Sequence, residues 1–386
     1  MLGRRPMPPS SDRALFANQL RAIAIIAVII THWCGVFWYS RDVVAQYIHA
    51  PALEGPPSSV IQWLTIPSFN YGPFGVAIFF MISGFVIPFS LARLTPKNFL
   101  IARALRIYPT YIVASVIMLG LSYLSSRYWN QPFKISTHTL LANLALINGD
   151  LYRPSIDLVN WTLSVEIKFY ILAAILYKSI RSGNLNACLL ASIMILAFCQ
   201  WQAVIFDFLN ISLPSFSVEG FKAELICVIF MFTGTVFYHH YTGAKSTKEL
   251  AAQSSMFLIL FFLCWPTTSW APQLHDVAQN YLYGAAVFAT SYALRRYFRP
   301  FQPIDFIANI SYPIYALHSI IGYLTIRILM DMGCRFPVAG LLTLTFVVGL
   351  AYTLHRLVEK PTMHLGKRIA APSSAAPREA ARDTSG

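Results

Sequence analysis

The chain has 386 residues, of which 56% are hydrophobic and only 12% are charged, and its mean hydropathy is +0.55. Because a soluble domain carries about 25% charged residues, this composition excludes a soluble globular protein, a disordered chain and a disulfide scaffold. What remains is an all-α, polytopic integral membrane protein. The net charge of +13 must then be explained by where the basic residues lie.

Ten segments are long and apolar enough to cross a lipid bilayer as helices. They are residues 20–38, 73–91, 107–124, 161–179, 185–206, 221–241, 253–270, 279–297, 306–330 and 337–357. The first has four arginines before or at its start and no small-residue cleavage site after it, so we interpret it as a signal anchor. Segment 137–149 is too short to span and is expected to be a re-entrant or interfacial helix. The domains predicted are a cytoplasmic segment at 1–14, a ten-helix membrane domain at 15–368 and a disordered cytoplasmic tail at 369–386.

The basic residues predict the orientation, because Lys and Arg collect in cytoplasmic loops. With the N-terminus inside, 21 of the 29 Lys and Arg residues lie on the cytoplasmic side and six lie outside. We therefore expect both termini in the cytoplasm. Once topology accounts for the positive charge, no basic and aromatic surface suited to nucleic acid is left.

An ionisable side chain in hydrocarbon costs about 2.5–3.5 kcal/mol, so each one is a candidate functional residue. Arg21 and His32 are almost three helical turns apart, which places both on one helix face at a separation of about 16 Å. His32 can transfer a proton near neutral pH; packing against a neighbouring helix is the alternative. Glu166 enters its span at a similar depth and is expected to orient the His32 imidazole, unless it forms a structural pair with Lys168 or an arginine.

Two further patterns involve the second and third spans. Arg103 and Arg106 lie three residues apart, on one helical face, and their planar guanidiniums suit a phosphate clamp. The alternative is ordinary positive-inside charge. Gly75 and Gly84, together with Ser83, allow another helix to approach closely, and Ser83 also offers a hydroxyl to a site.

The remaining polar and sulfur-containing side chains predict structural roles. The six cysteines are scattered without a C-x-x-C pair, so we interpret them as small buried side chains and not as zinc ligands or disulfides. Lys222 and Glu224, near the outer end of the sixth span, are expected to reach the membrane interface.

Six motifs follow one another along the chain. They are NQLRAIAIIAVIITHW, GVAIFFMISGFVI, ARALRIYP, WTLSVEIKFY, ISYPIYALH and VEKP. Together they resemble the membrane-bound acyltransferase family 3 over roughly residues 12–368. That family includes O-antigen and exopolysaccharide O-acetylases, nodulation-factor acetyltransferases and macrolide acyltransferases.

The resemblance implies an O-acyltransferase of the bacterial inner membrane, with acyl-CoA, usually cytoplasmic acetyl-CoA, as donor and no metal. The acceptor hydroxyl belongs to a glycan, such as a surface polysaccharide or lipopolysaccharide sugar, or to a small molecule such as a macrolide. The residue matched to the family's catalytic position is His32, with Glu166 in the active site and Arg103, Arg106 and Arg21 as ligands of the CoA phosphates. The motifs also carry further site candidates, namely Ser83, Trp161, Tyr170, Tyr315 and His318.

Three questions stay open at the level of sequence. A proton-coupled transporter or flippase also uses His and Glu at mid-membrane depth, although no related halves or matching broken helices are visible. The residues do not separate direct acyl transfer from an acyl-histidine intermediate, nor do they indicate an oligomeric state.

Overall fold

The computed structural model describes residues 15–269, 271 and 275–370, and these residues form helices joined by loops, with no β-strand among them. The long helices are α1 (Leu15–Ile30), α5 (Tyr71–Leu91), α6 (Pro96–Tyr128), α8 (Trp161–Ile175), α10 (Asn186–Phe208), α11 (Val218–Tyr241), α12 (Thr247–Cys264), α13 (His275–Ala293) and α17 (Phe336–Leu354). The shorter ones are α2 (Phe37–Tyr39), α3 (Arg41–Ile48), α4 (Ser59–Leu64), α7 (Thr137–Leu144), α9 (Tyr177–Ser182), α14 (Gln302–Asn309), α15 (Ser311–Leu317), α16 (Ile320–Asp331) and α18 (Lys360–Ala370). The predicted all-α class is confirmed.

Seven of the described helical stretches are long and apolar enough to cross a membrane. They are Leu15–Tyr39, Tyr71–Leu91, Pro96–Tyr128, Asn186–Phe208, Val218–Tyr241, Thr247–Thr267 and Phe336–Ile369. The pair α15 and α16, bent by 61°, makes an eighth if it is one span. The helices in the predicted spans 161–179 and 279–297, α8 and α13, are not among them, and α8 has only 15 residues, about 22 Å. A multi-pass helical membrane protein is thus confirmed, while the number ten and the cytoplasmic ends stay predictions.

The predicted terminal segments lie largely outside the residues that the structure describes. Segment 1–14 lies outside the described residues, as does the predicted tail from residue 371 onward, and α18 continues to Ala370. The predicted short helix within 137–149 is present as α7, with eight residues.

Helix α5 forms the centre of the bundle and packs against α1, α11 and α13. Contact with α11 is backbone to backbone, because a Cβ on Gly84 would lie 1.9 Å from the carbonyl oxygen of Met231, and a Cβ on Gly234 in α11 would lie 2.3 Å from the carbonyl oxygen of Met81. On the other side of α5, a Cβ on Gly75 would lie 2.7 Å from the carbonyl oxygen of Ala24 in α1. The predicted close approach at Gly75 and Gly84 is confirmed.

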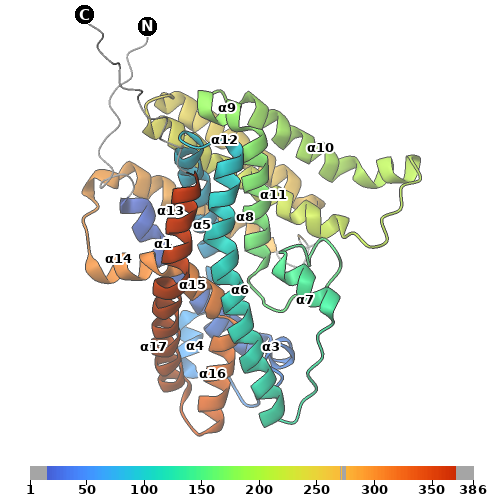
Figure 1. Cartoon of the computed structure of the whole chain (residues 1–386), viewed down its shortest axis with the longest axis vertical. Coiled ribbons are helices and arrows are strands. Elements are labelled where there is room, and N and C mark those ends of the chain that lie inside the picture. Colours follow the sequence, from blue (N-terminus) through green and yellow to red (C-terminus); the bar gives the residue numbers. More distant parts are fainter. Residues whose placement is uncertain (1–14, 270, 272–274, 371–386) are drawn as a thin grey trace, which may run out of the picture.

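The remaining helices extend the bundle at both ends (Figure 1). Helix α6 runs along most of its length, and α18 packs along α6. Helices α3, α4 and α16 gather at one end, and α9, α10 and α12 at the other. The six cysteines are all free thiols, as expected.

Two irregular helical segments meet inside the bundle. After α1 the first span continues as a π-helix, Thr31–Val36, a form that is frequent at functional sites. The predicted single span 306–330 is instead divided into α14, α15 and α16, with the sharp bend after His318. The Trp33 indole N–H donates to the His318 carbonyl oxygen at 2.8 Å. A Cβ on Gly322 would lie 2.3 Å from that indole nitrogen, so the glycine admits the tryptophan against the bend.

Candidate active site

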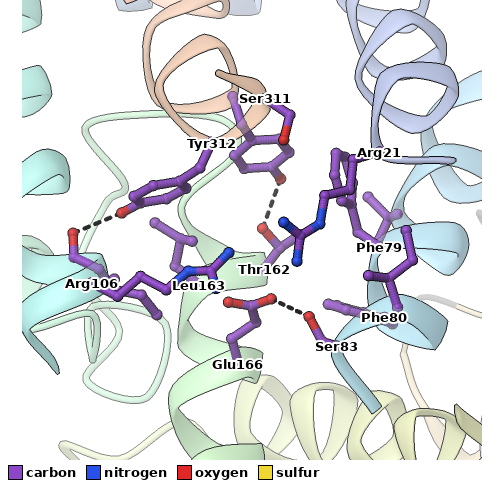
Figure 2. Close-up of a pocket in the computed structure, with 14 residues that line it drawn as sticks. Arg21, Phe79, Phe80, Ser83, Arg106, Thr162, Leu163, Glu166, Ser311 and Tyr312 are labelled. Carbon is purple, nitrogen blue, oxygen red and sulfur yellow. Dashed lines mark hydrogen bonds between the residues drawn. The ribbon is translucent and has the colours of Figure 1, made fainter. Parts of the chain in front are cut away.

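A pocket with about 650 Å³ of open space lies among the central helices. Five predicted site residues line it, each from a different helix: Arg21 (α1), Ser83 (α5), Arg106 (α6), Glu166 (α8) and Tyr315 (α15). Figure 2 shows Arg21, Ser83, Arg106 and Glu166 around the opening, with Tyr312 and Thr162 above. The fold thus brings polar residues from positions 21 to 315 together in one pocket whose other walls are apolar.

The Glu166 carboxylate is fixed by two hydroxyl groups. Its Oε1 accepts a hydrogen bond from Ser83 Oγ at 2.6 Å, and its Oε2 accepts one from the Tyr170 hydroxyl at 2.9 Å. Tyr170 is one turn further along α8, where residues four apart are neighbours on the helix surface. No hydrogen bond among the described residues joins Glu166 to His32. The partners of the Glu166 carboxylate are therefore Ser83 and Tyr170, and not the predicted imidazole.

Arg21 and Arg106 point their guanidiniums toward the Glu166 carboxylate (Figure 2). Within the described part of the chain, neither guanidinium has a hydrogen bond or an ion pair within 4 Å. Two cations beside one carboxylate leave the pocket with excess positive charge. Guanidinium forks of this kind bind phosphate or carboxylate groups strongly in a partly buried site.

Arg103 does not share this position. Its guanidinium donates to Ser90 Oγ and lies over the rings of Phe99 and Tyr170, at 5.5 and 5.9 Å from their centroids. The predicted arginine pair is therefore divided between two places. Arg106 lines the pocket, while Arg103 lies behind it against Tyr170, the residue that holds Glu166.

His32 lies beyond the wall of the pocket, and its neighbours are aromatic. The Tyr315 ring, which lines the pocket, is 5.6 Å from the His318 ring, and the His318 ring is 4.9 Å from that of His32, edge to face. The Nδ1 atom of His32 shares a hydrogen bond with the Tyr323 hydroxyl. This bond leaves Nε2 as the ring nitrogen available for chemistry.

His318 is fully buried and has a defined tautomer. Its Nδ1 donates to the Tyr315 carbonyl oxygen at 2.8 Å, because a carbonyl can only accept. In the neutral ring, Nε2 is then a bare acceptor, and it is buried without a partner among the described residues. The two predicted histidines are therefore brought together at the bend, with His318 between His32 and the pocket.

The start of α8 is fastened to α15 and α5. The Tyr315 hydroxyl donates to the Val159 carbonyl oxygen at 3.1 Å and lies 2.7 Å from Thr162 Oγ1. Trp161, the first residue of α8, packs edge-on against Phe80 with ring centroids 6.4 Å apart. Trp161 thus has a place beside the site and is absent from the pocket lining.

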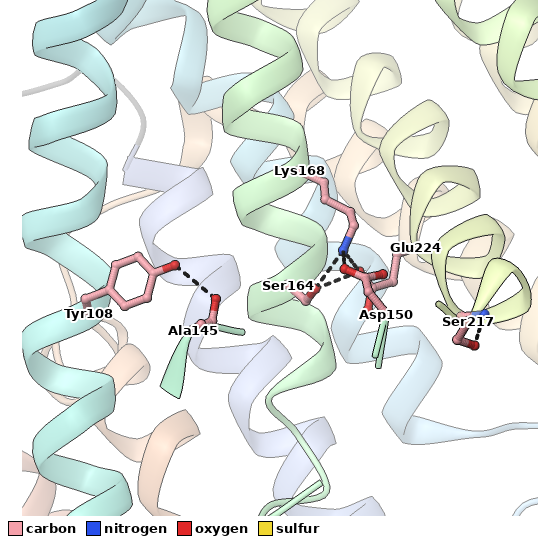
Figure 3. Close-up of polar contacts among 8 residues, drawn as sticks. Tyr108, Ala145, Asp150, Ser164, Lys168, Ser217 and Glu224 are labelled. Atoms are coloured by element: carbon pink, nitrogen blue, oxygen red, sulfur yellow. Dashed lines mark hydrogen bonds and ion pairs between the residues drawn. The ribbon is translucent and has the colours of Figure 1, made fainter. Parts of the chain in front are cut away.

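Lys168 forms an ion cluster on another side of α8 (Figure 3). Its Nζ lies 2.8 Å from Asp150 Oδ2 and also pairs with Glu224, while Ser164 Oγ donates to Glu224 at 2.6 Å. The predicted structural pair between Lys168 and Glu166 is therefore not formed. The cluster ties the loop before α8 to α11.

Lys222 and Glu224, which are expected to reach the membrane interface, are each only 4% exposed within the helix bundle. Glu224 turns inward because Lys168 and Ser164 satisfy its carboxylate there. Lys222 pairs with Glu219 at 2.8 Å.

No sequence pattern predicted a role for Asp157, Ser319 or Tyr323. The Asp157 carboxylate accepts hydrogen bonds from Ser319 Oγ and, at 3.3 Å, from the Val159 backbone N–H. Asp157 lies in the connecting loop, and burial raises the pKa of its carboxyl group to about 6. Because this residue lies outside the apolar segments, it is not among the charged side chains within predicted spans. Its position four residues before Trp161 was the one available signal.

No group of three or more His, Cys, Asp or Glu side chains within the described ranges is arranged to hold a metal ion. The pocket lining offers hydroxyl groups, two guanidiniums and aromatic walls.

Comparisons with known proteins identify the family of the chain. An acyltransferase called MdmB, from Streptomyces mycarofaciens, is 26% identical over 181 residues, which are 45% of this chain and 42% of the relative. The chain thus aligns with less than half the length of that relative. No solved structure matches significantly. A family profile described as an acyltransferase domain matches residues 15–356. That match covers nearly the whole described chain, including every candidate site residue, and the chain therefore belongs to the acyltransferase family 3.

Proposed function

We propose that the protein is a membrane O-acyltransferase that moves an acyl group, acetyl in the simplest case, from acyl-CoA to a hydroxyl of a glycan. The observation that carries this proposal is the pocket lined by Arg21 and Arg106, whose guanidiniums have no anionic partner within hydrogen-bond distance among the described residues. The CoA phosphates are the anions that such a pocket suits, and membership of an acyltransferase family supports this choice of donor.

In the proposed complex, Arg21 and Arg106 hold CoA phosphates, and the pantetheine arm carries the thioester past Tyr315 toward the histidines. Glu166, fixed by Ser83 and Tyr170, keeps the two guanidiniums oriented. This role replaces the predicted one, orientation of the His32 ring.

His32 is proposed to act through Nε2, because Nδ1 is occupied by Tyr323. As a general base, Nε2 takes the proton of the acceptor hydroxyl while its oxygen attacks the thioester carbonyl carbon. The C–S bond then breaks, the CoA thiolate leaves, and the imidazolium returns the proton to it. In the covalent variant, Nε2 first attacks the carbonyl carbon, the C–S bond breaks and the CoA thiolate leaves. The acceptor oxygen then attacks the acyl carbon, the bond between that carbon and Nε2 breaks, and the hydroxyl proton passes to the CoA thiolate.

The test uses the full chain, purified in lipid nanodiscs, with radioactive acetyl-CoA. We expect binding of acetyl-CoA, and transfer that falls about 10²–10⁴-fold in His32→Gln while acetyl-CoA binding is retained. Rapid quenching decides between the two routes, because label trapped on wild type and absent from His32→Ala identifies the covalent one. Normal transfer by His32→Gln would overturn the assignment of the catalytic residue.

A proton-coupled transporter is the second candidate, favoured by the broken helix α15–α16 with His318 at its bend. Such a protein would neither bind nor turn over acetyl-CoA, so the same experiment separates the two functions.

A further inference from the structure

A second cavity, of about 900 Å³, lies between α3, α6 and the loop segments 133–139 and 154–156. We propose that this α3–α6 cavity is the binding site for a sugar ring of the acceptor, an inference that rests on the proposed function. Its lining includes Gln46, Tyr47, Ser122, Phe133, Lys134 and Thr139.

The α3–α6 cavity adjoins the histidine pair from the α16 side. Helix α3 packs against both α6 and α16. Tyr47, which lines the cavity, is close enough to Asp157 and to the Tyr323 hydroxyl to interact with them electrostatically. Tyr323 in turn bonds to His32 Nδ1. The arginine pocket reaches the same pair from the α15 side, through Tyr315.

The loop that closes the cavity belongs to the same network. Ile156 lines the cavity, and the next residue, Asp157, accepts a hydrogen bond from Ser319, which follows His318 in the chain. One cavity wall is thus a single residue away from the bend that holds the histidines.

Phe133 presents a fixed aromatic face. Its ring contacts that of His49, with ring centroids 4.9 Å apart, and that of Tyr123, at 5.6 Å. The His49 ring is itself held, because its Nδ1 donates to the Pro132 carbonyl oxygen at 2.9 Å. An aromatic ring positioned by such contacts offers a stacking surface to the apolar C–H face of a sugar.

Most of the polar groups around this ring are neutral. Hydroxyl groups of Tyr47, Ser122 and Thr139 and the amide of Gln46 can both donate and accept hydrogen bonds, as the hydroxyls of a sugar require. Burial and the Asp157 carboxylate raise the pKa of Tyr47, which keeps its hydroxyl protonated. No carboxylate lines the described walls and Lys134 is their one ammonium or guanidinium, so the cavity suits a polyhydroxylated ring better than a CoA pyrophosphate.

The test measures acetyl transfer from acetyl-CoA to a panel of 4-nitrophenyl glycosides, with simple aliphatic alcohols for comparison, by the full chain in nanodiscs. We expect Phe133→Ala to raise the glycoside KM about fivefold, with unchanged acetyl-CoA affinity and unchanged hydrolysis of acetyl-CoA in the absence of acceptor. Gln46→Ala should act in the same direction, and since Gln46 is exposed its replacement does not threaten folding. Trp63→Ala, at an aromatic residue that is 88% exposed outside the cavity, is the matched control.

An unchanged glycoside KM in both cavity variants would overturn the inference. Turnover of acetyl-CoA with acetylation of the alcohols but of no glycoside would also overturn it. Failure of the wild type to bind or hydrolyse acetyl-CoA would instead refute the proposed function, so the two failures are distinguishable.

Discussion

Replacement of Arg106 by glutamine tests the pocket most directly. The Arg106 guanidinium has no hydrogen bond or ion pair within the described structure, so its loss leaves no protein group unpaired. We therefore expect the free energy of unfolding to change by less than about 0.5 kcal/mol. A charge-assisted hydrogen bond to a phosphate contributes about 1.5–3 kcal/mol. Acetyl-CoA affinity should then fall roughly 10- to 150-fold.

Arg103→Gln should give the opposite pattern, because Arg103 binds Ser90 and lies over Phe99 and Tyr170. Loss of these contacts is expected to lower the unfolding free energy by about 1–3 kcal/mol, with a smaller effect on acetyl-CoA affinity. Calorimetric titration with acetyl-CoA and thermal unfolding in nanodiscs measure the two quantities. Arg296→Gln, at an exposed arginine outside the pocket, is the control. Wild-type acetyl-CoA affinity in Arg106→Gln, or equal losses of affinity in both variants, would refute the reasoning.

Three further predictions concern the surroundings of the site. Tyr323→Phe removes the hydroxyl from His32 Nδ1, so kcat should fall about tenfold and the pH–rate profile should shift at constant acetyl-CoA KM; an unchanged profile would contradict the positioning role. Gly84→Ala forces α5 and α11 apart, because its Cβ would meet the Met231 carbonyl oxygen at 1.9 Å. We expect a loss of about 1–3 kcal/mol or more in unfolding free energy, with Gly120→Ala, where nothing lies within 4 Å, as the neutral control. Burial raises the pKa of Asp157 from 3.8 to about 6, so the folded state binds this proton more tightly than the unfolded chain. Its contribution to stability should then fall by about 3 kcal/mol between about pH 4 and pH 6. Denaturant titrations of Asp157→Asn should show a flatter dependence on pH, and an identical curve would argue against this burial effect.

Much of the pocket follows from residue type and depth in the sequence. Arg21 and Glu166 are charged side chains within apolar segments, where the free-energy cost of placing a charge in the membrane indicates a functional role. The structure places both in one pocket with Arg106. Small residues at Gly75 and Gly84 likewise predicted the close helix packing that the structure shows.

Other features depend on contacts that one segment cannot encode. Residues three apart on a helix differ by about 60° in direction, and Ser90 on another helix decides that Arg103 turns away while Arg106 faces the pocket. The bend after His318 has no proline or glycine at its position. It is stabilised by the Trp33 indole, which comes from nearly 300 residues earlier in the chain. The pairing of His32 with Tyr323 depends on this bend, so it was not visible in sequence.

The glycine contact between α5 and α11 also limits how the protein can move. With the two backbones touching at Gly84 and Gly234, these helices can neither slide past each other nor rotate without a steric clash. Together they form a rigid pair within the bundle. Any opening that admits a donor or releases a product must therefore come from displacement of the peripheral helices around this fixed pair.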